Sequence, residues 1–207
     1  DTTPGAFYLM SVFDLEWADI DGDLDQDLIY MGYDHGAGLA NDIFLYENDG
    51  SGNFTDITPS VLQLHTEGGD IDWADVDGDG DLDLLAGGDQ YAGSFVDIHL
   101  YQNDGSGGFT NITPAAFPDL TLFSSDFGDI DGDGDLDLVI IGSPSLFSPS
   151  PTVYLLENDG SGGFTDITPA SLEPMHSGEV EFSDIDNDGD LDLTAAGTDS
   201  TGAAMYL

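Results

Sequence analysis

Aspartates at alternate positions recur in four short stretches of this chain. Residues 75–83 illustrate the pattern, with the sequence Asp-Val-Asp-Gly-Asp-Gly-Asp-Leu-Asp. Carboxylates at positions 1, 3, 5 and 9 of a tight loop can converge on one cation, while Gly80 at position 6 permits a sharp turn and the carbonyl at position 7 can add a ligand. Oxygen donors in this number suit calcium, because zinc favours His or Cys and magnesium retains more of its water. The pattern therefore predicts calcium-binding loops.

Two other calcium motifs and an ion-free turn compete with this interpretation. An EF-hand loop needs Glu at position 12 and flanking helices, whereas the four stretches place Tyr30, Ala86, Ile140 and Ala195 there. Calcium-binding β-rolls need a Gly-Gly-x-Gly-x-Asp run, which the sequence lacks. The remaining alternative is a polar hairpin turn without an ion, although closely spaced carboxylates repel one another when no cation is bound.

The balance of charge narrows the choice of partners. The 207-residue chain contains 43 acidic residues and no Lys or Arg, which gives a formal net charge of −43. Without basic side chains the carboxylates must be neutralised by metal or solvent cations, so we expect no binding to nucleic acid or to an anionic membrane. No run of 18 apolar residues is present and there is no Cys, so we expect neither insertion into a membrane nor a disulfide.

Internal repeats organise the chain with a period of 55 residues. The tetrapeptide Asp-Ile-Thr-Pro at 56–59 returns at 166–169 and, with Asn in first place, at 111–114; residues 1–4 read Asp-Thr-Thr-Pro. This period predicts four repeats, the last of them truncated, that together form one unit. The predicted repeats cover residues 1–55, 56–110, 111–165 and 166–207.

Within each repeat the residue pattern is that of short β-strands. Apolar segments such as 83–87 and 98–101 alternate with turns, and Asn-Asp-Gly-Ser-Gly at 103–107 is typical of a hairpin because Gly and Asn tolerate positive φ. No amphipathic helical pattern is found. Four short strands in 55 residues predict an all-β fold made of four-stranded units of the kind that build β-propellers.

The order of these features resembles the FG-GAP or VCBS-type repeat. An aromatic residue and a small residue precede the first Asp of the loop, as at 73–75 and 127–129, and an apolar strand that ends in Gly follows the loop. This family includes the N-terminal propellers of integrin α-subunits and many secreted bacterial proteins. The resemblance covers nearly the whole chain and implies propeller blades that hold calcium in the hairpin loop between their first two strands.

Carried over position by position, the resemblance implies three to four calcium ions. Side-chain ligands are expected at positions 1, 3, 5 and 9 of each loop, and a backbone carbonyl ligand at position 7. Repeat one carries Leu24 where Gly is expected at position 6, so we expect its site to be distorted or weaker. The expected metal ligands are Asp19, Asp21, Asp23, Asp25, Asp27, Asp75, Asp77, Asp79, Asp81, Asp83, Asp129, Asp131, Asp133, Asp135, Asp137, Asp184, Asp186, Asp188, Asp190 and Asp192.

Two further positions recur in phase on the strand before each loop. One carries an aromatic residue that we predict to lie in the core between blades, namely Trp17, Trp73, Phe127 and Phe182. The other carries an acid three residues before each loop, on the opposite face of the strand. Such a row could line a central channel and hold another cation, or it could form solvated strand ends; its members are Glu16, Asp72, Asp126 and Glu181.

Sequence motifs outside the loops add little chemistry. Asn53 and Asn111 match the N-glycosylation motif, so N-glycans are predicted there as possible partners. The four His residues neither recur in phase nor show ligand spacing. No Ser-His-Asp spacing, Cys nucleophile or phosphate-binding loop is found, and we therefore expect no enzyme.

These observations favour a secreted or cell-surface protein with a structural or adhesive role. The fourth repeat stops at residues 205–207, before the segment that would complete its blade. The N-terminal residues could close a small ring, the sequence could be a fragment of a larger propeller, or a neighbouring subunit could complete the blade and give extracellular fibres. The alternative function is a propeller module that binds a glycan or a protein through its loops.

Overall fold

The computed structural model describes residues 10–34, 41–62, 66–90, 96–144, 151–199 and 202–206. The predicted repeat element at residues 1–4, together with His35, His65 and Leu207, lies outside the described residues. Within those ranges the chain is built of β-strands and one short 3-10 turn, η1 (Ser60–Leu62). No helix in this part of the chain is long and apolar enough to cross a membrane.

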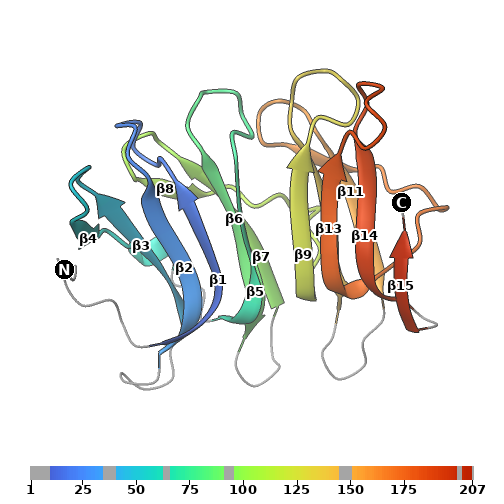
Figure 1. The fold of residues 1–207 in the computed structure, drawn as a ribbon, viewed down its shortest axis with the longest axis horizontal. Coiled ribbons are helices and arrows are strands. Elements are labelled where there is room, and N and C mark those ends of the chain that lie inside the picture. Colours follow the sequence, from blue (N-terminus) through green and yellow to red (C-terminus); the bar gives the residue numbers. More distant parts are fainter. Residues whose placement is uncertain are drawn as a thin grey trace.

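Four antiparallel sheets follow one another along the chain (Figure 1). The first three sheets have four strands each, paired in sequential order, and the last has three. The strands are β1 (Met10–Ala18), β2 (Asp27–Asp34), β3 (Asn41–Asn48) and β4 (Phe54–Asp56); β5 (Thr66–Ala74), β6 (Asp83–Gln90), β7 (Val96–Asn103) and β8 (Phe109–Asn111); β9 (Thr121–Gly128), β10 (Asp137–Ser143), β11 (Thr152–Asn158) and β12 (Phe164–Asp166); and β13 (His176–Ser183), β14 (Asp192–Asp199) and β15 (Gly202–Tyr206).

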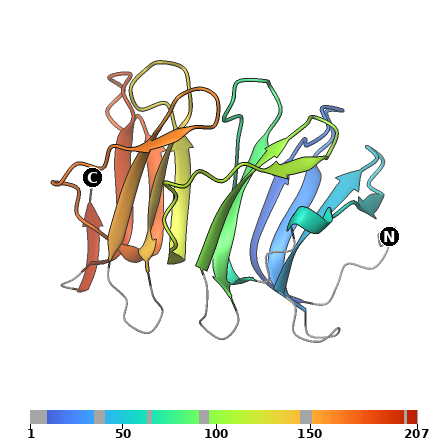
Figure 2. The same cartoon turned by 180° about the vertical axis from the view of Figure 1, so that it is seen from behind.

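The first strands of the four sheets lie side by side in the order β1, β5, β9 and β13. They form the side of the array that faces the viewer in Figure 1, and the later strands of each sheet extend away from them toward the side seen in Figure 2. Side chains bond these inner strands across the gap between sheets. Asp14 Oδ2 accepts a hydrogen bond from the N–H of Ile71 at 2.8 Å, and Asp70 Oδ2 accepts one from the N–H of Ser125 at 2.8 Å. The predicted fold class is confirmed: the chain is an all-β array of propeller-type blades, and the described blades form an open row.

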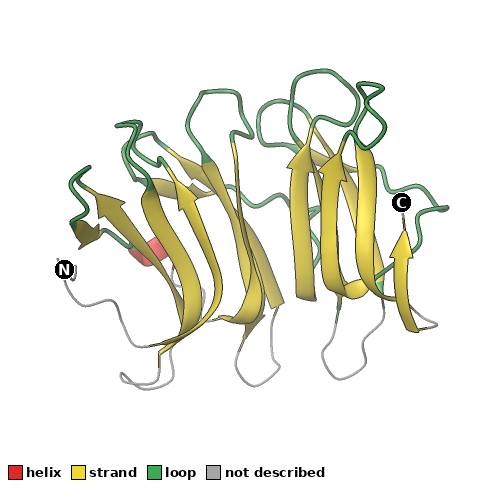
Figure 3. Cartoon of the chain, in the orientation of Figure 1, coloured by secondary structure: helices red, strands yellow, loops and turns green. Residues whose placement is uncertain are grey.

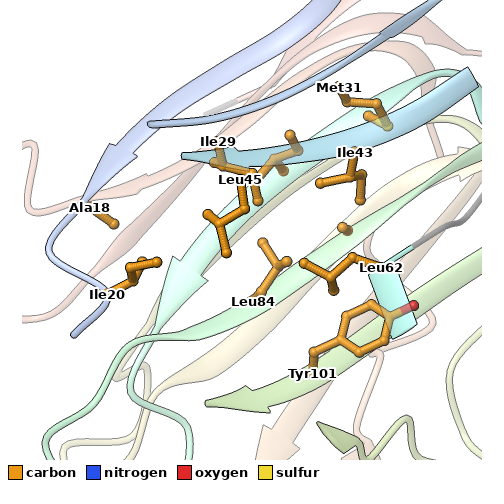
Figure 4. Packing of buried hydrophobic residues seen from close by; sticks show 11 residues of the cluster. Ala18, Ile20, Ile29, Met31, Ile43, Leu45, Leu62, Leu84 and Tyr101 are labelled. Carbon is orange, nitrogen blue, oxygen red and sulfur yellow. The ribbon is translucent and has the colours of Figure 1, made fainter. Parts of the chain in front are cut away.

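The core consists of apolar layers between adjacent blades. In the first layer, Ile29, Met31, Ile43 and Leu45 of one blade are at most 1% exposed and pack with Leu84 of the next (Figure 4). Similar layers lie between the second and third blades and between the third and fourth. Since burying one large aliphatic side chain contributes roughly 1.5–3 kcal/mol, these layers hold the array together.

The prediction that four in-phase aromatics fill the core is right for three of them. Trp73, Phe127 and Phe182 pack against the first, second and third layers. Trp17 is instead 49% exposed and packs edge-on against Phe54, with ring centroids 6.0 Å apart. In the other three blades, the preceding blade packs against the aromatic residue at this position, and β1 belongs to the first of the described blades.

Candidate metal centres

Each Asp-rich loop connects the first two strands of its blade, and the four loops lie along one edge of the array (Figure 3). We number them loop 1 (residues 19–27), loop 2 (75–83), loop 3 (129–137) and loop 4 (184–192). Backbone N–H groups fold each loop around its own side chains. In loop 2, Asp75 accepts hydrogen bonds from the N–H groups of Gly78 at 2.8 Å and Gly80 at 3.0 Å.

Three carboxylates meet in every loop. One oxygen from each of positions 1, 3 and 9 lies within 4.8 Å of the other two. All donors are oxygen, which is the donor set that calcium prefers. Charges at this spacing repel by roughly 3 kcal/mol per pair at an effective dielectric constant of about 20, so a cation suits the site. The triads are Asp19, Asp21 and Asp27; Asp75, Asp77 and Asp83; Asp129, Asp131 and Asp137; and Asp184, Asp186 and Asp192.

Positions 5 and 7 are not among these triads. The position-5 carboxylate accepts the backbone N–H of position 7, as Asp79 does from Asp81 at 3.0 Å. The position-7 side chain packs on the turn between the third and fourth strands, where a Cβ on Gly105 would clash with the carboxylate of Asp81. Their roles as ligands, by side chain at position 5 and by carbonyl at position 7, stay predictions; the residues are Asp23, Asp79, Asp133 and Asp188, and Asp25, Asp81, Asp135 and Asp190.

The position-9 carboxylates of loops 1 to 3 are buried. Asp27, Asp83 and Asp137 are each 1% exposed. Asp83 Oδ2 accepts the N–H of Val76 at 3.0 Å, and its Oδ1 accepts the N–H of Asn103 at 2.8 Å. Burial raises the pKa of Asp83 to about 6 against the effect of both hydrogen bonds, and burial also raises the pKa of Asp27 and of Asp137. A cation bound beside these groups would favour their charged form.

An Asn at the end of the third strand anchors each of the first three loops, which the sequence analysis missed. Asn103 Nδ2 donates to the carbonyl of Leu82 in its own blade at 3.2 Å and to the carbonyl of Ile20 in the preceding blade at 2.8 Å. Asn158 makes the equivalent contacts in the third blade. The sequence does contain a signal for this contact, because Asn recurs before Asp-Gly in the first three repeats. The hairpin turn already explained that recurrence, so no contact with the loops was predicted.

A polar residue of β7 also reaches a triad. Gln102 Nε2 donates a hydrogen bond to Asp77 Oδ2 at position 3 of loop 2. Glu47 and Glu157 occupy the same position of the repeat in the first and third blades. These residues were not among the predicted ligands, because they are distant from the loops in sequence.

Loop 1 differs from loops 2 and 3 in the residue at position 6, and loop 4 differs from them in its exposure to solvent. Leu24 keeps the loop 1 backbone in shape by adopting φ +76°, and its N–H donates to Asp19 Oδ2 at 3.0 Å as the Gly at this position does in the other loops. The loop 1 backbone therefore keeps the shape of the other loops, in place of the expected distortion. Leu24 carries left-handed backbone strain instead, which costs a non-Gly residue roughly 1–2 kcal/mol. In loop 4 the position-9 carboxylate, Asp192, is exposed.

The acidic row on the inner strands is half-buried in the two middle blades, at Asp72 and Asp126, and exposed in the first and last, at Glu16 and Glu181. Burial raises the pKa of Asp72 to about 8, with Asp70 and Asp126 adding to the effect, and burial raises the pKa of Asp70 to about 6. The pKa of Glu16 and of Asp126 is raised too, chiefly by burial. A cation site in this row stays a prediction.

The two glycosylation motifs coincide with turn contacts. Asn53 is exposed, and its Nδ2 donates to Asp49 Oδ2 at 2.7 Å. Asn111 is exposed as well, and its Oδ1 accepts hydrogen bonds from the N–H and the Oγ1 of Thr113 at 3.0 and 2.7 Å. Asp166 makes the same pair of bonds with Thr168, so this Asn has a structural role, and attachment of a glycan stays a prediction.

Blades in sequential order, each with an oxygen-only triad in its first hairpin, define a propeller-type repeat protein with candidate metal centres. The chain belongs to the FG-GAP-like repeat family, whose pattern matches residues 19–86, 88–140 and 143–195. The resemblance predicted from the sequence is thereby confirmed. FG-GAP repeats typically occur in extracellular proteins. A search among curated proteins found no match to the chain.

Proposed function

We propose that the protein is a calcium-stabilised structural or adhesive module that works outside the cell and has no catalytic role. The observation that carries this proposal is the set of four in-phase triads, three of which have a buried position-9 carboxylate. Calcium would join positions 1 and 3 of the loop to position 9 at the start of the second strand, and so close the hairpin. Extracellular calcium modules bind with a Kd of roughly 10⁻⁴–10⁻³ M, which matches a saturated structural site outside cells.

Ion counting tests this proposal. Equilibrium dialysis against millimolar calcium, followed by elemental analysis, is expected to find three or four ions per chain. Asp77→Asn should remove about one of them, whereas Asp119→Asn, which alters an exposed carboxylate away from the loops, should remove none. Less than one ion per chain, or complete displacement by an equal concentration of magnesium, would contradict a calcium role.

We further propose that copies of the protein associate head to tail. On β1, Leu15 and Trp17 are 42% and 49% exposed, although the preceding blade buries their counterparts Ile71 and Trp73 in the first layer. At the other end, Met205 on β15 is 64% exposed. Trp17 and Met205 therefore occupy positions that lie on the two sides of an internal blade interface, which supports the last blade of a second copy as the partner for β1. The rest of this side of the first blade is buried, so the contact would be confined to β1; the buried residues are Leu28, Tyr30 and Tyr46.

Sedimentation velocity and negative-stain microscopy in calcium test this assembly. Trp17→Ser and Met205→Ser should each weaken assembly, while Val61→Ser, which changes an exposed apolar side chain of η1 between the first two blades, should not. Monomers at every concentration would contradict the assembly. Monomers that bind a glycan or a protein would support a ligand-binding propeller module in its place.

A further inference from the structure

Hydrogen bonds join the cation loop of one blade to that of the next. Asp83 of loop 2 accepts the backbone N–H of Asn103 through Oδ1 at 2.8 Å. The side-chain amide of Asn103 donates to the carbonyl of Ile20 in loop 1 at 2.8 Å, and the N–H of Ile20 donates to Asp27 Oδ2 at 3.1 Å. One Asn of the second blade therefore links the position-9 carboxylates of loops 1 and 2.

The same link recurs between loops 2 and 3. Asp137 Oδ1 accepts the N–H of Asn158 at 2.8 Å, and the amide of Asn158 donates to the carbonyl of Val76 at 2.8 Å. The N–H of Val76 donates in turn to Asp83 Oδ2 at 3.0 Å. The two carboxylate oxygens of Asp83 thus belong to different links, one toward loop 1 and one toward loop 3.

Water has little access to this path. None of its seven residues is more than 3% exposed. Buried hydrogen bonds polarise one another, so a change of charge or position at one carboxylate acts on the next bond more than on solvent. In order, the path comprises Asp27, Ile20, Asn103, Asp83, Val76, Asn158 and Asp137.

We propose that Asn103 and Asn158 are positioning residues that couple the first three cation loops, so that these loops bind calcium with positive cooperativity. The inference rests on the proposed calcium function and adds an interaction between its sites. Calcium at loop 2 holds Asp83 in place, which fixes the backbone of Asn103 and of Val76 through the N–H groups that donate to it. The side-chain amides of Asn103 and Asn158 pass this order on to Asp27 and Asp137 through their bonds to Ile20 and Val76. Coupling between sites typically changes affinity by about 5–150-fold.

The first blade provides a matched control. Asn48 has the same position in its repeat, and its N–H bonds to Asp27 Oδ1 at 2.7 Å. Its side-chain amide donates to the carbonyl of Gln26 at 3.1 Å, within its own blade. Asn48→Ala therefore removes an equivalent amide from loop 1 but leaves the link through Asn103 intact.

An NMR calcium titration can follow the loops one by one. The amides of Gly22, Gly78 and Gly132 donate to the position-1 Asp of loops 1, 2 and 3 at 2.9, 2.8 and 2.8 Å, so each reports its own loop. Disabling loop 2 with Asp77→Asn is expected to raise the calcium midpoints at Gly22 and Gly132 at least fivefold.

A second set of variants tests whether Asn103 carries the coupling between loops 1 and 2. With Asn103→Ala, the midpoint at Gly22 should no longer respond to Asp77→Asn, whereas the midpoint at Gly132 should still respond through Asn158. With Asn48→Ala, the response at Gly22 should persist. If Asn103→Ala does not fold, Asn103→Leu approximately preserves the size of the side chain and has no group that can donate the hydrogen bond.

The outcomes separate the coupling from the function on which it rests. If Asp77→Asn leaves the calcium midpoints at Gly22 and Gly132 unchanged in a chain with native Asn103, the coupling is overturned. A response at Gly22 that survives loss of the Asn103 amide would also overturn it. Amides that do not shift at all with calcium would contradict the proposed function itself.

Discussion

Leu24 donates its backbone N–H to Asp19 Oδ2 at 3.0 Å while it holds φ at +76°, in the left-handed region. Gly80 makes the same bond to Asp75 at 3.0 Å with φ +96°. The loop therefore imposes this conformation on whichever residue occupies position 6. In loop 1 the imposed conformation strains a side chain that is 88% exposed and has no packing to offset the strain.

Replacing Leu24 by Gly should therefore stabilise the protein. Relief of left-handed strain is worth roughly 1–2 kcal/mol, and the greater freedom of Gly in the unfolded chain offsets about 0.4–1 kcal/mol of it. We expect a net gain of up to about 1.5 kcal/mol in urea denaturation with calcium present. Leu24→Ala retains the strain and serves as the control; an equal gain from Ala would contradict this explanation.

The loops and blades could be predicted from sequence because their signals are local and repeat in phase. Asp, Gly and apolar residues at fixed spacing identify the loops, and the hairpin turn with Asn-Asp-Gly-Ser-Gly identifies the outer strands. The converging triads follow from that spacing. The left-handed φ of Leu24 did not follow, because sequence shows that Gly is missing without showing whether the backbone or the side chain yields.

Buried and exposed position-9 carboxylates should differ in their effect on stability. Asp83→Asn places an amide where two backbone N–H groups now donate, so a buried donor loses its partner. We expect a loss of about 2–3 kcal/mol even in EGTA, measured by urea denaturation. Asp192→Asn changes the same position of loop 4, where the carboxylate is exposed, and should cost less than about 1 kcal/mol. Equal losses would contradict a special role for burial.

Stability should fall as pH rises, through the inner-strand acids. The folded pKa of Asp70 is about 6 and that of Asp72 about 8, both above the value of 3.8 for the unfolded chain. Folding therefore favours the protonated forms, and their contribution is complete below about pH 4 and is lost as pH rises through 6 to 8.

Asp72→Asn should remove most of that loss. At pH 8 and saturating calcium, the variant is expected to be more stable than the native chain by at least about 2 kcal/mol, and the difference should shrink toward pH 4. Glu16, Asp70 and Asp126 face Asp72 and contribute to its shift. Asp119→Asn, at an exposed position, controls for the loss of one charge. A difference between native and Asp72→Asn chains that is independent of pH would refute this assignment.

Contacts between blades could not be predicted in the same way. Asn103 and Ile20 are 83 residues apart, and neither shows a pattern that names the other as its partner. The exposure of Trp17 likewise depends on which blade lies before it, although the residue matches Trp73 in phase. Local spacing therefore predicts the sites within blades, and only the packed array shows how the sites are connected.

Thermal unfolding with and without calcium tests the central claim most directly. At tenfold excess over Kd, each site adds about 1.4 kcal/mol, so four sites add roughly 6 kcal/mol, close to the whole stability of a typical domain. For a chain of this size, EGTA should then lower Tm by about 10–20 °C, and calcium but not an equal concentration of magnesium should restore it. An unchanged Tm in EGTA would contradict the account that calcium holds these blades together.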